Sequence, residues 1–350
     1  MIRSTFFNII NKFKKKDLVG NGLKKQYFQG EQEQIDTFRV FLCSNVYKDH
    51  YYGSQESGDM EHLASVKYGK QKKFVSEIID SQVVELFEQV HQMGGVCSYP
   101  PPLRNLPYYS LEEKLKRCFE IKKMDVKGME VQHPRGFKLR VKQSLVDHVE
   151  AGYGVHVEGE ITPGTVVAFY PGDTYNARSV IPPLVIKDND YMICRYDGTL
   201  IDGRSWNKRA DELALQYKYF QETGTNATPK DLQKYRNPYA IGNFINHPPM
   251  GKKPNVISYS YNFSHYFPKE LQDFIPNRKV TESKVFKDTT TFQPAMVIIA
   301  YEPIKDQELY LNYRFNPVNQ PYADWYHQPD VEEAHRRWGE TIQSPFSFIK

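Results

Sequence analysis

Residues 243–249 read NFINHPP, residues 254–256 read PNV, and this stretch decides the fold once the motifs around it are added. The side chains of Asn246 and His247 can hydrogen-bond an adenosine edge or a neighbouring loop. His247 could also serve as a metal ligand or a general base. No second His or Cys stands near it in the sequence. We therefore expect no metal at this position.

Three further short motifs flank this stretch. Residues 152–155 read GYGV directly before a β-type run, residues 170–172 read YPG at the end of another, and residues 308–313 read ELYLNY. Without a Cβ, Gly152 and Gly154 let the backbone approach a ligand closely. Alone, the three motifs have ordinary interpretations, which are a plain turn, a strand followed by a turn, and an edge strand with a buried Tyr. The order and spacing of all four motifs are more specific than any one of them.

Short β-type runs, broken by Gly and Pro, begin near Gly152. The runs are GVHV, TVVAFY, DYMICRY, TLID, AMVIIAY and ELYLNY. A polar insert lies around 204–237, and residues 252–291 are polar and aromatic with few clear elements. The pattern predicts a mainly β domain over residues 146–318, followed by an aromatic tail over residues 319–350.

The first 145 residues indicate mainly helix. Apolar residues recur at three- and four-residue steps before Gly94-Gly95, which ends a helix in this pattern. These residues are Val75, Ile78, Ile79, Val83, Leu86, Phe87 and Val90. Ser110 and Glu113 form a capping box before a second helical pattern. We interpret residues 1–145 as a helical docking or scaffold region without chemistry of its own.

Composition argues against several classes of protein. The chain has 46 basic and 42 acidic residues and a net charge of +4, which gives no strong nucleic-acid signal. It has no run of about 18 apolar residues, so we expect no transmembrane segment. Its four cysteines form no CxxC pair, which argues against a structural zinc site and for a reducing, intracellular compartment.

Residues 1–16 read MIRSTFFNIINKFKKK and contain several basic residues but no acid. Apolar residues fall at helical spacing within this segment. Three interpretations stay open, namely an ordinary basic amphipathic helix, a mitochondrial transit segment, and a helix that binds a membrane surface. We expect a nuclear or cytoplasmic protein, with mitochondrial import as the alternative that this segment allows.

The four motifs in this order resemble the motif series of the SET-domain lysine methyltransferases, over residues 152–317. Residues 197–203, 237–242, 267–271 and 276–277 are similar to one subgroup of that family. The resemblance implies a mainly β SET fold, in which short-stranded sheets are joined by a pseudoknot. A helical N-terminal region precedes this fold, so the chain is α+β overall.

The resemblance also implies a function and a set of site residues. S-adenosylmethionine is the implied cofactor, and a lysine of a protein substrate is the implied methyl acceptor. The residues implied to hold the cofactor are Gly152, Tyr153, Gly154, Asn246 and His247. Tyr313 is the implied catalytic Tyr, and Tyr170 is implied to line the lysine channel.

Tyrosines suit this chemistry because methyl transfer to an amine is a direct displacement. Aligning the reacting groups can contribute roughly 7–11 kcal/mol. The amine must be neutral, although the pKa of a Lys starts near ~10.4. Desolvation in an aromatic channel and a nearby sulfonium charge would both lower that pKa. Aromatic walls also hold a methylated ammonium through cation–π contacts.

The sequence departs from the family pattern in two places. Pro248 and Pro249 stand where most histone-directing members have a Ser and a Cys, and the zinc-binding cysteines that follow the domain in those members are missing. We hypothesise that Tyr322, Trp325 and Tyr326 close the lysine channel instead, the alternative being that they pack on the domain surface. These departures argue against assuming a histone target. A catalytically inactive SET-fold binding or scaffold protein is the alternative function.

Overall fold

The computed structural model describes seven stretches of the chain, which are residues 24–47, 60–93, 130–176, 189–204, 237–280, 293–316 and 322–338. Several features expected from the sequence lie outside them. These features are the basic segment at residues 1–16, the capping box at Ser110 and Glu113, and nearly all of the polar insert around 204–237.

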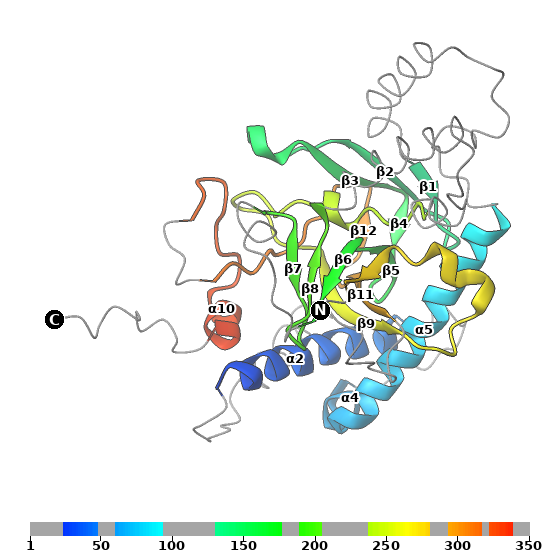
Figure 1. Cartoon of the computed structure of the whole chain (residues 1–350). Helices are drawn as coiled ribbons and strands as arrows, with labels where there is room; N and C mark the ends of the chain where they lie inside the picture. The colour runs from blue at the N-terminus through cyan, green and yellow to red at the C-terminus, as the bar shows by residue number, and fades with distance from the viewer. Residues whose placement is uncertain are drawn as a thin grey trace, which may run out of the picture.

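Helices occupy both ends of the described chain (Figure 1). The α-helices are α2 (Lys24–Val46), α4 (Met60–Ser65), α5 (Tyr68–Gln92) and α10 (Val331–Trp338). The 3₁₀ helices are η2 (Val149–Ala151), η3 (Gly242–Phe244) and η4 (Lys269–Phe274). None of the described helices combines the length and the apolar character that crossing a membrane requires.

The strands between these helices are short. They are β1 (Glu130–Gln132), β2 (Lys138–Gln143), β3 (Tyr153–Glu158), β4 (Glu160–Ile161), β5 (Val166–Phe169), β6 (Gly172–Tyr175), β7 (Met192–Cys194), β8 (Leu200–Asp202), β9 (Val256–Phe263), β10 (Asn277–Lys279), β11 (Gln293–Ala300) and β12 (Ile304–Lys305). In the described residues they form small sheets in the orders β1-β2-β3, β10-β6-β8-β7, β5-β11-β9 and β12-β4.

Pairing within these sheets is antiparallel except between β10 and β6. Small, mainly antiparallel sheets beside a few helices are the mixed α+β arrangement that the sequence predicts, and they are consistent with a SET-like fold. The pseudoknot stays a prediction.

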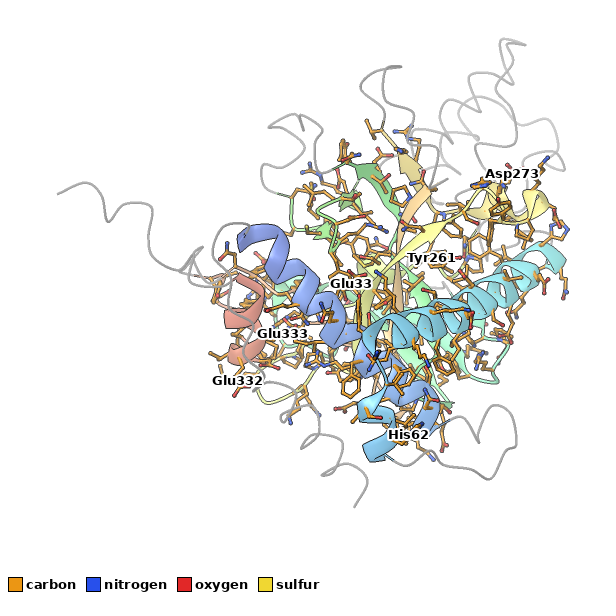
Figure 2. The ribbon with its side chains drawn as sticks, turned by 90° about the horizontal axis from the view of Figure 1, so that it is seen from below. Glu33, His62, Tyr261, Asp273, Glu332 and Glu333 are labelled. Carbon is orange, nitrogen blue, oxygen red and sulfur yellow. The ribbon has the colours of Figure 1, made fainter. Side chains whose placement is uncertain are left out.

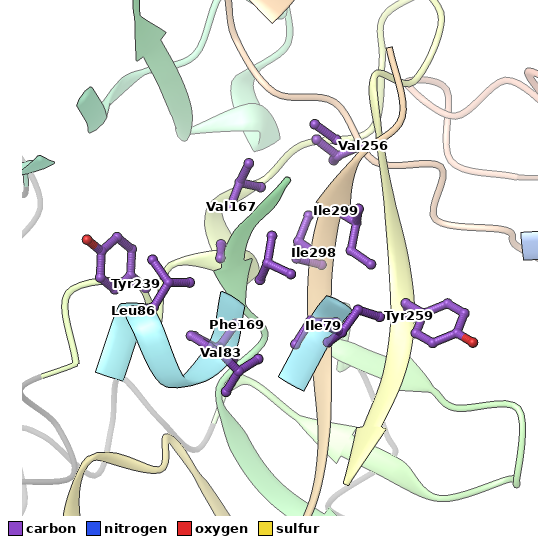
Figure 3. Packing of buried hydrophobic residues seen from close by; sticks show 14 of the residues in the cluster. Ile79, Val83, Leu86, Val167, Phe169, Tyr239, Val256, Tyr259, Ile298 and Ile299 are labelled. Carbon is purple, nitrogen blue, oxygen red and sulfur yellow. The ribbon is translucent and has the colours of Figure 1, made fainter. Parts of the chain in front are cut away.

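The apolar face of α5 covers the sheet β5-β11-β9 (Figure 3). Ile79, Val83 and Leu86 are buried in the same hydrophobic cluster as Phe169 of β5 and Ile298 of β11. Burial of this stripe explains the helix, because side chains three and four positions apart share one face. The helix predicted from the apolar spacing is confirmed.

A polar side chain of α5 also fixes the sheet. Gln82 is buried, and its side-chain Nε2 donates to the carbonyl of Gly164 at 2.9 Å. Its Oε1 accepts from the backbone N–H of Val166 at 2.8 Å. The amide therefore satisfies backbone groups at the start of β5 that would otherwise be buried without partners.

Helix α2 lies beside α5 on the same side of the molecule (Figure 2). Its Phe38 and Phe41 belong to the same cluster as the β5-β11-β9 core. The hydroxyl groups of Thr37 on α2 and Tyr259 on β9 hydrogen-bond at 2.8 Å. Within the described residues, the N-terminal helices and the β-rich part thus share one hydrophobic core.

Two strands lie inside the region 1–145 that the sequence predicts as mainly helical. Strand β2 pairs with β3 from Lys138 opposite Glu158 to Gln143 opposite Tyr153, and β1 pairs with the other edge of β2. Alternating burial along β1 and β2 reflects a sheet with one face on the core. The helical expectation is therefore wrong for residues 130–132 and 138–143, and the domain boundary at residue 145 stays a prediction.

Strand β9 was also not expected, because residues 252–291 read as having few clear elements. It pairs with β11 over its whole length, from Val256 opposite Ala300 to Phe263 opposite Gln293. The ELYLNY motif, by contrast, was expected as a strand. Within residues 308–311 the structure has isolated bridges rather than a continuous strand.

Candidate functional site

The GYG segment links η2 to β3, with Gly152 at the turn and Tyr153 and Gly154 as the first residues of the strand. Gly152 has φ +51°, in the left-handed region that residues with a Cβ avoid, and a Cβ added there would meet no atom within 4 Å. Its carbonyl accepts a hydrogen bond from the backbone N–H of Ser144 at 3.0 Å. The turn therefore needs a glycine and leaves open space beside it.

Gly154 has a different reason to lack a side chain. A Cβ there would overlap a carboxylate oxygen of Glu308, lying 2.7 Å from Glu308 Cδ and 3.3 Å from Asn246 Nδ2. The missing side chain at this glycine thus makes room for Glu308. Its role in holding a cofactor stays a prediction.

Asn246 joins the GYG segment to the C-terminal motif. Its Nδ2 donates to the carbonyl of Tyr153 at 3.1 Å and to Glu308 Oε1 at 3.3 Å. Its own carbonyl accepts from the N–H of Leu311 at 2.9 Å. Asn246 thus connects residues 152–154 with residues 308–311, which lie far apart in the sequence.

Glu308 is a site residue that the sequence reasoning did not single out. Its side chain is fully buried, and its carboxylate accepts from Ser144 Oγ at 2.7 Å, from the N–H of Leu145 at 2.7 Å and from Tyr310 Oη at 3.2 Å, besides Asn246. These donors compensate a buried charge that would otherwise be costly. In the sequence, the sign of this role is that an acidic residue, Glu308, begins the apolar run of the ELYLNY motif.

His247 is held in its neutral form. Burial lowers its pKa to about 4. Its Nδ1 accepts from the backbone N–H of Tyr313 at 3.3 Å, which places the ring proton on Nε2, and Nε2 donates to the carbonyl of His327 at 2.8 Å. Both ring nitrogens are therefore engaged. Within the described stretches, no three or more His, Cys, Asp and Glu side chains are grouped to hold a metal ion.

Tyr313 lies directly against this histidine. Its hydroxyl donates to the carbonyl of Ile245 at 3.2 Å. Burial first, and then the phenol of Tyr191, raise the pKa of Tyr313 above its usual range. The phenol is therefore protonated at neutral pH and acts as a hydrogen-bond donor rather than as a base.

Tyr170 follows β5, and its hydroxyl donates to the carbonyl of Tyr191 at 2.8 Å. Burial raises its pKa well above the usual range, and the nearby phenol of Tyr313 adds to this effect. The phenol of Tyr313 thus lies close enough to Tyr170 to disfavour ionisation of its hydroxyl.

Asn243 is a second side chain that the sequence reasoning did not single out as a site residue. Asn243 and Tyr170 flank the same glycine, Gly203. A Cβ added to Gly203 would lie 3.3 Å from the Cβ of Asn243 and 2.9 Å from Cε1 of Tyr170. Neither polar atom of its buried amide has a hydrogen-bond partner among the described residues. A buried amide without partners calls for a bound group or water, here close to Tyr170.

The aromatic tail packs on the site. The ring of Tyr326 stacks on His247 at 4.4 Å between centroids and on Phe315 at 4.5 Å. The ring of Trp325 lies edge-on to Tyr313 at 5.9 Å, and its Nε1 donates to Glu150 at 2.7 Å. The tail therefore lies over the site rather than on a remote surface.

The structure brings the predicted residues together in two adjoining groups. The first is the GYG segment with Asn246, and the second is His247 with Tyr313, Tyr170 and the tail. The two groups meet because Asn246 and His247 are consecutive in the chain.

Comparison with known proteins gives the chain two curated relatives. Both are named SET domain-containing protein 9, one from Homo sapiens and one from Pongo abelii. The human protein is 28% identical over 187 residues, covering 49% of this chain and 57% of the relative. The orangutan protein is 28% identical over 189 residues, covering 49% of this chain and 63% of the relative. No protein-family model matches the chain.

Proposed function

We propose that this chain, which is related to the SET-domain family, is an S-adenosylmethionine-dependent methyltransferase that acts on a lysine side chain of a protein. The subgroup that the sequence motifs resemble is that of the two relatives, SET domain-containing protein 9. The observation that carries the proposal is the junction of the GYG turn, Asn246-His247 and Tyr313 at one place.

The described residues fit the proposed cofactor. When bound, S-adenosylmethionine supplies a methyl group on a positively charged sulfur, which a neutral amine displaces directly. Gly152 leaves open space on its side of the turn, and Asn246 fixes the backbone of Tyr153. The neutral ring of His247 adds no positive charge that would repel a sulfonium.

The tyrosines would receive the lysine. The hydroxyl of Tyr313 and the carbonyl of Ile245 lie together, so this pair can orient an amine and stabilise a polarised methyl group. Burial keeps the phenols of Tyr313 and Tyr170 protonated, so neither phenol takes the proton that the ammonium must lose before transfer. Burial beside aromatic rings lowers the lysine pKa and favours that loss.

The direct test is cofactor binding followed by turnover. We expect the purified chain to bind S-adenosylmethionine in calorimetry and to transfer a labelled methyl group to itself or to lysines in a cell lysate. Acid hydrolysis of the product and amino-acid analysis would identify methyl-lysine. Binding without transfer would indicate the scaffold alternative instead, and the absence of binding would contradict the proposal.

Replacing Trp325 with Ala is expected to weaken S-adenosylmethionine binding about ten-fold. The indole offers a flat aromatic surface beside Tyr313, and stacking of a base on such a surface is worth about 1–3 kcal/mol. Calorimetric titration measures the change. Tyr266→Ala is the matched control, because this ring is 84% exposed and lies outside the site. Equal affinity and equal transfer in the Trp325 variant would show that the tail only packs on the domain.

A further inference from the structure

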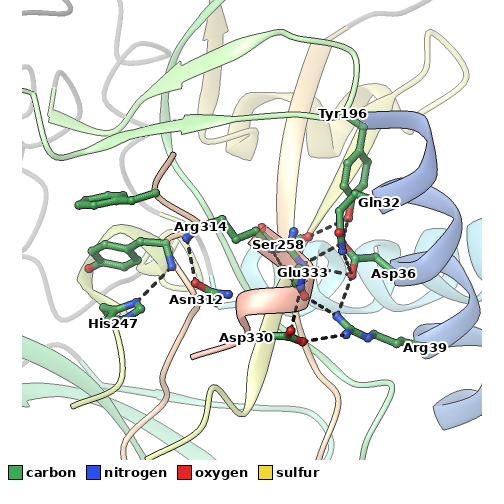
Figure 4. Close-up of polar contacts among 12 residues, drawn as sticks. Gln32, Asp36, Arg39, Tyr196, His247, Ser258, Asn312, Arg314, Asp330 and Glu333 are labelled. Atoms are coloured by element: carbon green, nitrogen blue, oxygen red, sulfur yellow. Dashed lines mark hydrogen bonds and ion pairs between the residues drawn. The ribbon is translucent and has the colours of Figure 1, made fainter. Parts of the chain in front are cut away.

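Four charged residues form a network around Arg314, the residue that follows Tyr313, and we call this network the charged clasp (Figure 4). Its members are Asp36 and Arg39 of α2, Arg314, and Glu333 of α10. Arg314 Nη2 lies 2.9 Å from Asp36 Oδ2, and its Nε lies 2.5 Å from Glu333 Oε1. Arg39 Nη1 bridges the same two carboxylates, at 3.2 Å to Asp36 and 3.0 Å to Glu333.

The clasp is buried. The side chain of Asp36 has no exposed surface, and those of Glu333, Arg314 and Arg39 are 6%, 9% and 12% exposed. Two positive and two negative charges balance within these four residues, and the partly exposed Asp330 adds a longer contact to Arg39 at 4.0 Å. Desolvation offsets much of the attraction between such charges, so hydrophobic residues could stabilise this contact as well. Fold stability alone therefore gives a weak reason for four buried charges.

Other groups hold the two acids in place. The hydroxyl of Tyr196 donates to Asp36 Oδ2 at 2.6 Å, and Gln32 Nε2 donates to Asp36 Oδ1 at 3.0 Å. On α10, the carboxylate of Asp330 caps the helix by accepting from the backbone N–H of Glu333 at 2.8 Å. The carboxylate of Asp36 thus has donors besides the two arginines, and the helix turn that carries Glu333 is capped.

The backbone of Arg314 is in the left-handed region, with φ +55°. This conformation costs free energy for a residue with a Cβ and is found where surrounding contacts impose it. The N–H of Arg314 donates to Asn312 Oδ1 at 2.9 Å, and the side chain is held by the clasp. The turn lies between Tyr313, which contacts Ile245, and Phe315, which stacks on Tyr326.

We infer that Arg314 is a positioning residue for Tyr313, and that Asp36 and Glu333 act through it. The clasp fixes the left-handed turn, and the turn sets where the Tyr313 hydroxyl and the Phe315 ring lie. Through Glu333 of α10 it also anchors the aromatic tail at a second point, beyond the stacking of Tyr326 on His247. Helix α2, 278 positions from Arg314 in the sequence, thereby belongs to the transfer apparatus. The catalytic part of this inference rests on the proposed function.

The test compares four variants of the full chain. Asp36→Asn and Arg314→Ala break the clasp, and Arg314→Gly breaks it while allowing the left-handed backbone at no steric cost. Glu33→Gln is the matched control, because Glu33 lies on the same helix (Figure 2) and its ion pair among the described residues is with the half-exposed Lys72, at 2.8 Å. Each variant is measured below its melting temperature for S-adenosylmethionine affinity, kcat and hydrogen exchange of the amides of residues 312–315.

We expect Asp36→Asn and Arg314→Ala to lower kcat about 10²-fold, the loss that a small misplacement of a catalytic group can cause, with cofactor affinity unchanged. The N–H of Tyr313, which donates to His247, should exchange faster in both. Arg314→Gly should retain more activity than Arg314→Ala, because glycine adopts the turn unaided. Glu33→Gln should match the natural chain.

Lower melting temperatures with unchanged kcat and unchanged exchange at Tyr313 would overturn the inference and make the clasp a fold-stabilising contact. Equal activity of the Gly and Ala variants at Arg314 would also overturn the role of the turn. If Asp36→Asn does not fold, the two Arg314 variants decide the question. The exchange measurement needs no turnover, so it tests the clasp even if the proposed function is wrong, which the binding and transfer assay of the natural chain reports separately.

Discussion

Replacing Tyr313 with Phe is expected to slow methyl transfer by roughly 10²- to 10³-fold, the usual cost of removing one oriented donor from a reacting centre. The hydroxyl is the group lost, because the ring and the backbone N–H that donates to His247 remain. Burial keeps this hydroxyl protonated, so the variant removes a donor and not a base. Binding of S-adenosylmethionine should be unchanged. Single-turnover transfer and calorimetry measure the two quantities.

Tyr239→Phe is the matched control for this variant. Tyr239 is fully buried, and its hydroxyl donates to Gln89 Oε1 of α5, with the carbonyl of Gln132 at 3.0 Å as a second acceptor. The variant therefore loses a buried tyrosine hydroxyl and its hydrogen bonding without touching Tyr313. Equal transfer by the natural chain and Tyr313→Phe would remove Tyr313 from its assigned role. Equal losses in both variants would indicate a general effect on stability.

Replacing Gly154 with Ala is expected to abolish cofactor binding and to lower the free energy of unfolding by about 3 kcal/mol, near the upper end for overpacking a core. The new Cβ would overlap the Glu308 carboxylate. This carboxylate ends a flexible side chain, but donors from Ser144, Leu145 and Asn246 hold it, so it cannot move without losing them. Chemical denaturation and calorimetry measure the two effects.

Two comparisons separate the clash from a general effect of the substitution. Gly69→Ala, in the first turn of α5, meets no atom within 4 Å and should stabilise the chain slightly. Glu308→Ala removes the clashing group, so Gly154→Ala should lower the free energy of unfolding much less in that background. The double-mutant cycle should therefore show strong coupling between the two positions. Additive costs would mean that Gly154 matters for a reason other than Glu308.

The sequence predicts secondary structure best where a single spacing of apolar residues dominates a segment. The apolar stripe of α5 is visible because each buried residue, such as Val83 or Leu86, has a buried partner three or four positions away. Strand β9 was missed although Ile257, Tyr259, Tyr261 and Phe263 alternate along it, since the Ser and Asn residues between them resemble a loop. Its burial depends on β11, whose paired residues lie 30 to 44 positions away.

The candidate site was predictable only in part, for a similar reason. Asn246, His247 and Tyr313 could be named because they stand in recognisable motifs. The role of Glu308 depends on donors from Ser144 and Leu145, and no local pattern connects these residues to it. The same is true of the charged clasp, whose members lie in three distant segments and belong to no periodic pattern.

The segment around Leu309 has a consequence for how the chain is made. It lies between β3, where the N–H of Leu309 donates to Val155, and the segment that carries Asn246, which accepts from Leu311. Ser144 and Glu308, which meet beside it, are 164 positions apart. At about 5–20 residues per second, a ribosome needs roughly 8–33 s to cover that distance. During this interval β3 has an unpaired edge of the kind that other chains can bind. The site is therefore completed only after residues 308–311 have been made, and until then the edge of β3 that they cover is open to pairing with other chains.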